Sequence, residues 1–182
     1  MAKVTTPRER WVEAGLSALT VGGPEAVRIE SLATSLGVTK GGFYWHFADR
    51  RALLDEMLDT WERTMVDDVI ASVESAGGDG RARLRDLFLV GQGATPLLPL
   101  ELAVRDWSRR DPTVLDRLTR VDNRRMEYLR SLFIDFVEDP AEVEARSFLV
   151  FCVWIGQPLI AAEHGRRSRR DVVQSALELA LR

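Results

Sequence analysis

The segment from Ile29 to Ala48 constrains the fold of this chain more than any other. Its first half places Ile29, Leu32 and Leu36 at helical spacing, which predicts a short helix with one apolar face. Gly37 follows this helix, and glycine best supplies the positive φ that a sharp turn between two helices needs. The segment therefore predicts a helix-turn-helix.

The second helix of this motif is expected to run from Thr39, as its N-cap, to about Phe47. Its outward positions combine small, cationic and hydrogen-bonding residues: Lys40, Gly41, Gly42, Tyr44 and His46. Two glycines inside a helix each cost about 1 kcal/mol relative to alanine, but they let a backbone approach DNA closely. This mixture suits phosphates and base edges better than a core. An ordinary helical hairpin within a core is the alternative.

A third helix is expected to begin after Asp49, with the Asp49 side chain as N-cap and with Arg50 and the first N–H groups suited to a phosphate. Residues 38–47, followed by Asp49-Arg50 and Ala52-Leu53-Leu54, resemble the signature of the TetR family of bacterial transcriptional repressors. Family signatures commonly have lysine where Arg50 stands. The specific resemblance covers residues 8–60, and beyond it only length and helical pattern match.

The resemblance implies a homodimeric transcriptional regulator that binds double-stranded DNA at a palindromic operator and is released by a small organic effector. A repressor is expected, with an activator as the alternative. By motif position, the residues expected to bind DNA are Arg28, Ser31, Thr39, Lys40, Gly42, Tyr44, His46 and Arg50. Arg28 and Ser31 are expected to contact the DNA backbone. Phe43 and Phe47 are expected to pack inward.

The whole chain is expected to be all-α, with about nine helices separated by glycine- and proline-containing breaks. The predicted helices are 8–21, 26–36, 39–47, 50–76, 81–91, 95–108, 111–137, 141–164 and 169–181. Residues 1–50 are expected to form the helix-turn-helix domain. Residues 51–182 are expected to form a helical body for ligand binding and dimerisation.

The predicted helix 141–164 is apolar on several sides, and together with helix 169–181 it has one apolar face too many for a small monomer. A four-helix interface made by these helices and their copies in a second chain explains this surplus. The residues expected at this interface are Phe151, Ile155, Leu159, Val173 and Leu177. A central core helix is the alternative.

The body of TetR-family proteins encloses a ligand pocket that is typically apolar with a few polar groups. The residues that would line it here are Trp61, Phe88, Gln92, Arg105, Trp107, Met126 and Trp154. Among them, Gln92 and Arg105 would be the polar anchors. A plain core would show the same composition, because aromatic residues and methionines at helical spacing are typical of both.

The formal net charge of −3 is unusual for a DNA-binding protein. Residues 1–50 contain six Lys and Arg against five Asp and Glu, a net charge of +1, and the remaining 19 against 23 give −4. No basic block marks an electrostatic footprint, which argues against a non-specific architectural DNA binder. The DNA-binding prediction therefore rests on the motif, with local attraction from Arg28, Lys40, Arg50 and Arg51.

An enzyme, a metal site and a cofactor are not expected. The chain has two histidines far apart and one cysteine, Cys152, so no cluster has metal-ligand spacing. No glycine-rich phosphate loop and no Gly-x-Ser-x-Gly motif are present. The rival function is that of an all-helical lipid-binding, small-molecule-binding or scaffold protein without specific DNA binding.

The expected location is the cytoplasm, away from membranes. No apolar run approaches the length of about 18 residues that a membrane helix requires, and residues 1–10 lack the apolar stretch of a signal peptide. A lone cysteine cannot form an intramolecular disulfide. Cys152 is expected to be a reduced core residue, with redox sensing as the alternative.

Overall fold

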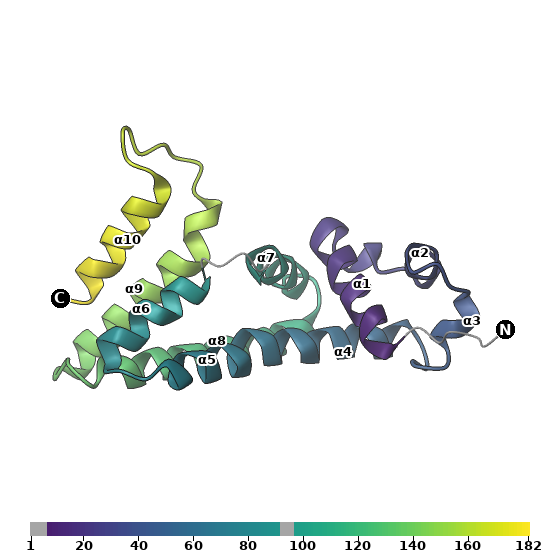
Figure 1. Cartoon of the computed structure of the whole chain (residues 1–182), viewed down its shortest axis with the longest axis horizontal. Helices are drawn as coiled ribbons and strands as arrows, with labels where there is room; N and C mark the ends of the chain where they lie inside the picture. The colour runs from purple at the N-terminus through teal and green to yellow at the C-terminus, as the bar shows by residue number, and fades with distance from the viewer. Residues whose placement is uncertain (1–6, 92–96) are drawn as a thin grey trace. The chain divides into compact units, whose positions relative to one another are not determined.

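The computed structural model describes residues 7–91 and 97–182. All regular elements in these ranges are helical and none is a strand, which confirms the all-α prediction (Figure 1). The chain divides into two compact units, which are described separately. Unit 1 is drawn from residues 1–68 and 94–121, and unit 2 from 69–93 and 122–182. The domain boundary expected at residue 50 thus falls within unit 1.

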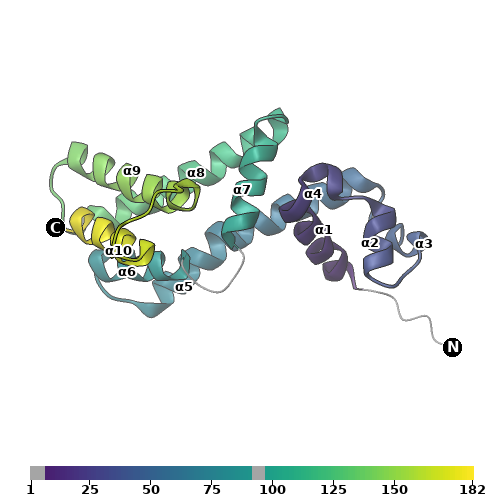
Figure 2. The same cartoon turned by 90° about the horizontal axis from the view of Figure 1, so that it is seen from above.

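The elements of unit 1 are the N-terminal helices, α7 and the beginning of α8. Their bounds are α1 (Arg8–Gly22), η1 (Pro24–Ala26), α2 (Ile29–Ser35), α3 (Lys40–Phe43), α4 (Arg50–Glu62), the π-helical η2 (Arg63–Asp68), α7 (Leu97–Ser108) and α8 (Pro112–Phe133). Figure 2 shows α2 and α3 beside α1 and the start of α4. The helix predicted over 26–36 is thus divided into a 3₁₀ turn and α2.

The local signals around the two short helices are mostly confirmed. Gly37 has a φ of 68°, so the turn after α2 uses the left-handed region that glycine favours. Asp49 caps α4 by accepting the N–H of Ala52 at 2.8 Å. Thr39, in contrast, makes no side-chain capping bond. The second helix of the motif is also shorter than predicted, because α3 ends at Phe43 and continues as turns to His46.

Unit 1 is held together by close packing of α1 on α4. A Cβ atom added at Gly15 would lie 2.5 Å from Met57 Sδ, so the Met57 side chain could keep its position only beside a glycine. Trp11, Met57 and Trp61 are fully buried in this core. α7 also packs on α1. The helix-turn-helix therefore has a rigid support.

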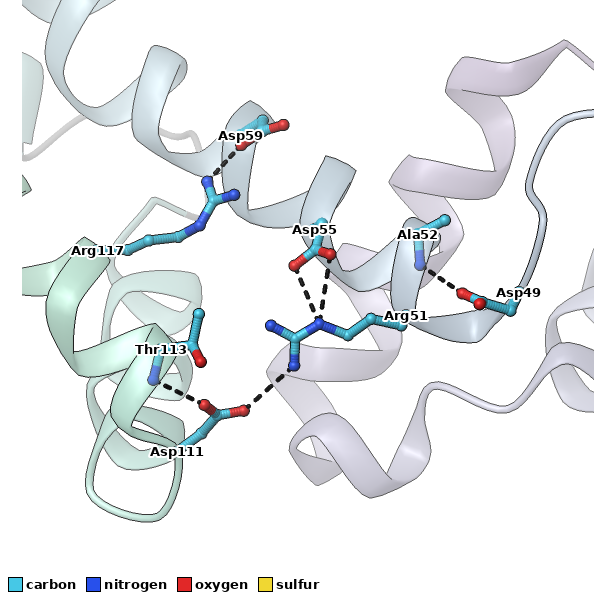
Figure 3. Close-up of polar contacts among 8 residues, drawn as sticks. All are labelled: Asp49, Arg51, Ala52, Asp55, Asp59, Asp111, Thr113 and Arg117. Atoms are coloured by element: carbon cyan, nitrogen blue, oxygen red, sulfur yellow. Dashed lines mark hydrogen bonds and ion pairs between the residues drawn. The ribbon is translucent and has the colours of Figure 1, made fainter.

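Ion pairs link α4 to the corner between α7 and α8 within the same unit (Figure 3). Arg51 Nε lies 3.2 Å from Asp55 Oδ1, and Arg51 Nη1 lies 3.6 Å from Asp111 Oδ2. One turn further along α4, Arg117 of α8 pairs with Asp59. Surface pairs of this kind contribute about 0–1 kcal/mol each, so they align these elements more than they stabilise them.

Unit 2 contains α5 (Val69–Ala76), α6 (Gly80–Gly91), the rest of α8, α9 (Pro140–Gly156), η3 (Gln157–Leu159) and α10 (Arg169–Ala180). Its core is formed by apolar side chains of α6, α8, α9 and α10 and of the residues that follow α8 and α10: Leu84, Phe88, Leu129, Leu132, Phe133, Val137, Val143, Val150, Leu177 and Leu181. Ser168 caps α10 by accepting the Asp171 N–H at 3.1 Å.

Three sequence expectations in this unit are wrong. α9 ends at Gly156 rather than His164, because Pro158 has no N–H to donate and disfavours helical geometry at the preceding residue. α8 ends at Phe133 rather than Val137, with a turn after it. Cys152 is exposed instead of buried, because the face of α9 that bears it is not covered within this chain.

Candidate nucleic-acid interface

The short α3 helix sits on an aromatic cluster. Phe43 and Phe47 are buried, and their rings stack with centroids 5.3 Å apart. Trp11 of α1 meets Phe43 edge-on, also at 5.3 Å. The inward packing expected of Phe43 and Phe47 is confirmed. Burial of these two rings directs their neighbours Tyr44 and Trp45 outward, with 53% and 80% of their surface exposed.

The glycine at position 42 has no explanation inside the chain. Its φ is not in the left-handed region, and an added Cβ would meet nothing within 4 Å. Gly41 is nearly as open, since its added Cβ would lie 3.8 Å from Thr39 Oγ1. Neither backbone strain nor internal packing therefore requires these glycines, which cost helix stability. Their absent side chains leave the outer surface of α3 flat.

Lys40, the first residue of α3, does not stand alone on this surface. Its ammonium forms an ion pair with the Glu30 carboxylate of α2. The side chains of Lys40 and Glu30 are 50% and 66% exposed. The hydrogen bond from Lys40 lowers the pKa of Glu30 and raises the pKa of Lys40, so both groups are charged at neutral pH.

The Arg50 side chain, at the start of α4, donates hydrogen bonds to backbone carbonyls of the segment that precedes α2. Its Nε donates to the Val27 carbonyl at 2.6 Å, and its Nη2 donates to the Pro24 carbonyl. These bonds tie the start of α4 to the segment that leads into α2. The expected contact of Arg50 with a phosphate stays a prediction, and the observed contacts give this residue a positioning role.

Arg8 anchors the other end of the motif. Its guanidinium donates to the Glu56 carboxylate, with Nη2 2.9 Å from Oε2, and to the His46 carbonyl. It also lies 4.3 Å from the centre of the Phe47 ring. Arg8 of α1 therefore links the segment that follows α3 to helix α4. The sequence analysis missed this residue because its partners lie 38 and 48 positions away.

The other residues expected to bind DNA lie around this surface. Arg28, Ser31 and Thr39 are exposed, and Arg28 Nε donates to the Glu25 carbonyl at 3.1 Å. His46 is half-buried, and its Nε2 has no hydrogen-bond partner among the described residues. The exposed set also includes Trp45 and Glu30, which the sequence analysis did not select. The sequence did contain a signal for Trp45. It lies midway between Phe43 and Phe47, which both point inward, so its own side chain must point outward.

The residues expected to line an effector pocket are divided between the two units. Trp61, Arg105 and Trp107 belong to unit 1, whereas Phe88, Met126 and Trp154 belong to unit 2. Gln92 lies outside the described residues. In unit 1, Trp61 Nε1 donates to Glu101 Oε2 at 3.2 Å, and Arg105 Nε donates to Glu101 Oε1 at 2.8 Å. Glu101 is fully buried and was missed, because its burial depends on how α7 packs.

The unit 2 members of this set are core or near-core residues. Phe88 is buried, and Met126 packs on the same apolar cluster. Trp154 lies with its ring centre 5.0 Å from the Arg125 guanidinium carbon. No described contact brings these three side chains around one cavity.

The residues expected at a dimer interface lie on α9, η3 and α10 and differ widely in their exposure. Leu177 is only 3% exposed and packs in the core of its own chain, so it offers almost no surface to a partner. Phe151, Ile155 and Val173 are half-buried, and Leu159 is 66% exposed. Large exposed apolar side chains that the sequence analysis did not select also lie on these helices: Phe148, Leu149 and Leu179.

A hollow between α9 and α10 follows the same surface. Its lining is mostly apolar and includes Leu149, Val153 and Ala176, with Glu142 and Arg146 as its polar groups. In the described part of the chain, no three His, Cys, Asp or Glu side chains form a group that could hold a metal ion. Within residues 7–91 and 97–182, no helix is long and apolar enough to cross a membrane.

Residues 12–57, which include this motif, match the model of the family described as bacterial regulatory proteins, tetR family. The N-terminal region of this chain is therefore similar to the TetR family. The tetracycline repressor protein class A from transposon 1721 of Escherichia coli is 34% identical over 98 residues. That alignment covers 54% of this chain and 41% of the repressor, so the chain matches less than half the length of this relative.

Solved structures extend the likeness in fold to the rest of the chain. A candidate transcriptional regulator from Saccharomonospora viridis, crystallised with choline, has a TM-score of 0.78 at 18% identity, covering 94% of both chains. A TetR-family regulator from Streptomyces coelicolor has a TM-score of 0.77 at 15% identity, covering 96% of this chain and 93% of that one. The ketosteroid transcriptional regulator of Mycobacterium tuberculosis has a TM-score of 0.69 at 17% identity, covering 98% and 95%.

Proposed function

We propose that this protein is a homodimeric transcriptional regulator, a repressor, that binds a palindromic operator through α2 and α3 and is released by a small organic effector. The observation that supports this most directly is the outer surface of α3. There, Lys40, Tyr44 and Trp45 lie exposed above a buried aromatic support, and half-buried Gly42 adds no side chain beside them. Cationic, aromatic and flat backbone groups together suit a DNA groove.

DNA binding is tested by selecting fragments of genomic DNA with the full chain and titrating the selected sequence at physiological salt. Lys40→Ala and Tyr44→Ala should each weaken binding to the selected site by at least several-fold. Leu115→Ala is the control, because Leu115 is an exposed apolar residue of α8 outside the motif. If both variants bind as tightly as the unchanged chain, the assignment of α3 as the reading helix is wrong.

The homodimer is proposed from the apolar surface of α9 and α10. A single helix-turn-helix makes few base contacts, and such modules usually pair on two-fold-related half-sites. Phe148 and Leu149 of α9 and Leu179 of α10 are more than half exposed, a costly arrangement for a chain that remains single in water. A second copy of the same helices would cover them. We place the interface on these residues together with Phe151, Ile155, Leu159 and Val173.

A small organic effector is proposed by analogy with relatives whose names refer to tetracycline and ketosteroid and with the structure that contains choline. Among the expected pocket residues, Trp61 and Arg105 share the buried Glu101 carboxylate. A ligand that competes for Glu101 would disturb α4, whose first turn belongs to the DNA-binding region. Coupling requires unequal affinity for the two states, typically 1–3 kcal/mol.

The effector is tested by a thermal-shift screen of small molecules, followed by operator titration with each compound that stabilises the protein. The proposal expects at least one such compound to weaken operator binding five-fold or more. A compound that stabilises the protein without changing operator affinity contradicts the coupling. Ligand binding by a protein that selects no DNA sequence would instead support a helical small-molecule-binding protein.

A further inference from the structure

A carboxylate accompanies the cation at the start of α3. Glu30 is in the first turn of α2, and its Oε1 atom accepts a hydrogen bond from Lys40 Nζ. Neither side chain is buried, since 66% of Glu30 and 50% of Lys40 remain exposed. Any DNA group that reaches the Lys40 ammonium must therefore also meet the Glu30 carboxylate.

Folding and general DNA affinity give little reason for this carboxylate. An exposed ion pair contributes little to stability. Near a phosphate backbone, a carboxylate opposes binding, because most non-specific affinity comes from neutralising phosphates with cations. The net charge of residues 1–50 is only +1, so each negative group there has a large relative effect. Glu30 is better explained by a contact that uses an acceptor.

The two side chains match the major-groove edges of one kind of base pair. Guanine presents two acceptors, O6 and N7, to a lysine ammonium, and cytosine presents the N4 amine to a carboxylate. An A·T pair also offers one amine and one carbonyl. However, its amine lies beside the N7 acceptor, which repels a carboxylate, and its thymine lacks a second acceptor for lysine.

We propose that Glu30 and Lys40 together select one C·G base pair in each operator half-site. The Glu30 carboxylate accepts from the cytosine N4 amine, and the Lys40 ammonium donates to guanine O6 or N7. The ion pair already holds both groups side by side in the free protein, so reading this base pair requires little rearrangement. This inference rests on the proposed DNA-binding function.

The test uses the full chain and a panel of duplexes in which every position of the selected half-site is replaced in turn. Affinities are measured by fluorescence anisotropy at one fixed salt concentration, because salt changes affinity for all sequences. The variants are Glu30→Gln and Lys40→Met. Glu13→Gln is the matched control, since Glu13 is an exposed α1 residue paired with Arg10 and loses the same charge.

Glu30→Gln should reduce the preference for C·G about ten-fold at one position of each half-site and leave the other positions unchanged. Lys40→Met should reduce the preference at the same position. Glu13→Gln should leave the preference at every position intact. Circular dichroism of each variant verifies the helical fold, and Glu30→Ala provides a second removal of the carboxylate.

Three outcomes would overturn the inference. Glu30→Gln could strengthen binding to all duplexes by the same factor, which would make Glu30 only a neutraliser of Lys40. It could leave every affinity unchanged, or the two variants could relax different positions. If the unchanged chain shows no sequence preference at all, the proposed function itself fails, and this result is distinct from the other three.

Discussion

At the scale of single residues, Gly42 opposes the stability of the helix that contains it. The position has open space around its Cα and no left-handed φ, so alanine would fit without strain. The residues at both ends of this surface serve positioning: Arg8 ties His46 to α4, and Arg50 ties α4 to the entry of α2. The surface thus combines a well-anchored support with a residue that has no side chain.

We predict that Gly42→Ala stabilises the protein and weakens operator binding. Alanine should add up to about 1 kcal/mol to the free energy of unfolding, because it loses less backbone entropy than glycine in a helix. The added methyl group should hinder close approach to DNA. Thermal unfolding and operator titration measure the two effects. Gly156→Ala in α9, where a Cβ also meets open space, should leave operator affinity unchanged. Stabilisation with unchanged operator affinity at Gly42 would contradict the prediction.

A second prediction separates two roles of Arg50. Arg50→Gln should lower the free energy of unfolding by about 1–3 kcal/mol, because carbonyls of Pro24 and Val27 lose charge-assisted hydrogen bonds. If Arg50 also meets a phosphate, the dependence of log K on log salt should become shallower by about one unit. An unchanged slope with reduced stability would restrict Arg50 to positioning, and unchanged stability would contradict the role seen here.

At the scale of elements, α4 is the helix on which unit 1 depends. Its first turn holds the entry to α2, its middle packs against Gly15 of α1, and Trp61 near its end reaches the buried Glu101 of α7. The π-helical segment Arg63–Asp68 then interrupts the regular helix before α5. Because π segments disturb the regular backbone ladder, they often occur where a helix has a functional role.

The joint between α1 and α4 should depend on pH. Because Arg8 donates to the Glu56 carboxylate, the pKa of Glu56 lies below its usual value of 4.5. A lowered pKa means that the carboxylate stabilises the fold fully above pH 4.5 and loses this effect as the pH falls through its folded-state pKa. Both side chains are more than a third exposed, so solvent screening keeps the contribution below about 1 kcal/mol.

Thermal unfolding of the unchanged chain and of Glu56→Gln, followed from neutral pH to about pH 3, measures this contribution. The difference in stability should be present at neutral pH and shrink below pH 4.5. Glu9→Gln, in the first turn of α1, is the control for loss of a carboxylate near Arg8. A difference that persists unchanged into acid would show that the ion pair is not its source.

At the scale of the whole molecule, the proposed dimer depends on the apolar surface of α9 and α10. Leu149 and Leu177 both line the hollow between these helices, but Leu149 is 58% exposed and Leu177 only 3%. A charged residue in place of Leu177 would therefore disrupt folding. A charged residue in place of Leu149 would instead test whether two chains associate.

We predict that Leu149→Glu converts the dimer to monomers and weakens operator binding at least ten-fold, because one half-site contact is lost. Sedimentation velocity gives the oligomeric state, and thermal unfolding verifies that the monomer is folded. Ile134→Glu is the matched control, since Ile134 is 66% exposed outside α9 and α10. A folded Leu149→Glu protein that remains dimeric would place the interface elsewhere.

The sequence by itself determined the helical class, the helix-turn-helix and several helix ends. These features depend on neighbours within one or two turns: apolar spacing sets a helix face, Gly37 permits a left-handed turn, and Asp49 and Ser168 cap the next N–H groups. The inward packing of Phe43 and Phe47 was predictable for the same reason. The end of α9 was predicted wrongly at His164, although Pro158 gave a local signal for an earlier end.

Only the tertiary structure decided which charged and apolar residues share a surface. The ion pair of Glu30 with Lys40, and the bonds of Arg50 to carbonyls 23 and 26 residues earlier, require the helices to be placed against each other. The same holds for Leu149 and Leu177, which look alike in an apolar pattern but lie on opposite sides of the burial boundary. Helical periodicity depends on local backbone geometry, whereas burial and charge pairing depend on packing between segments distant in the chain.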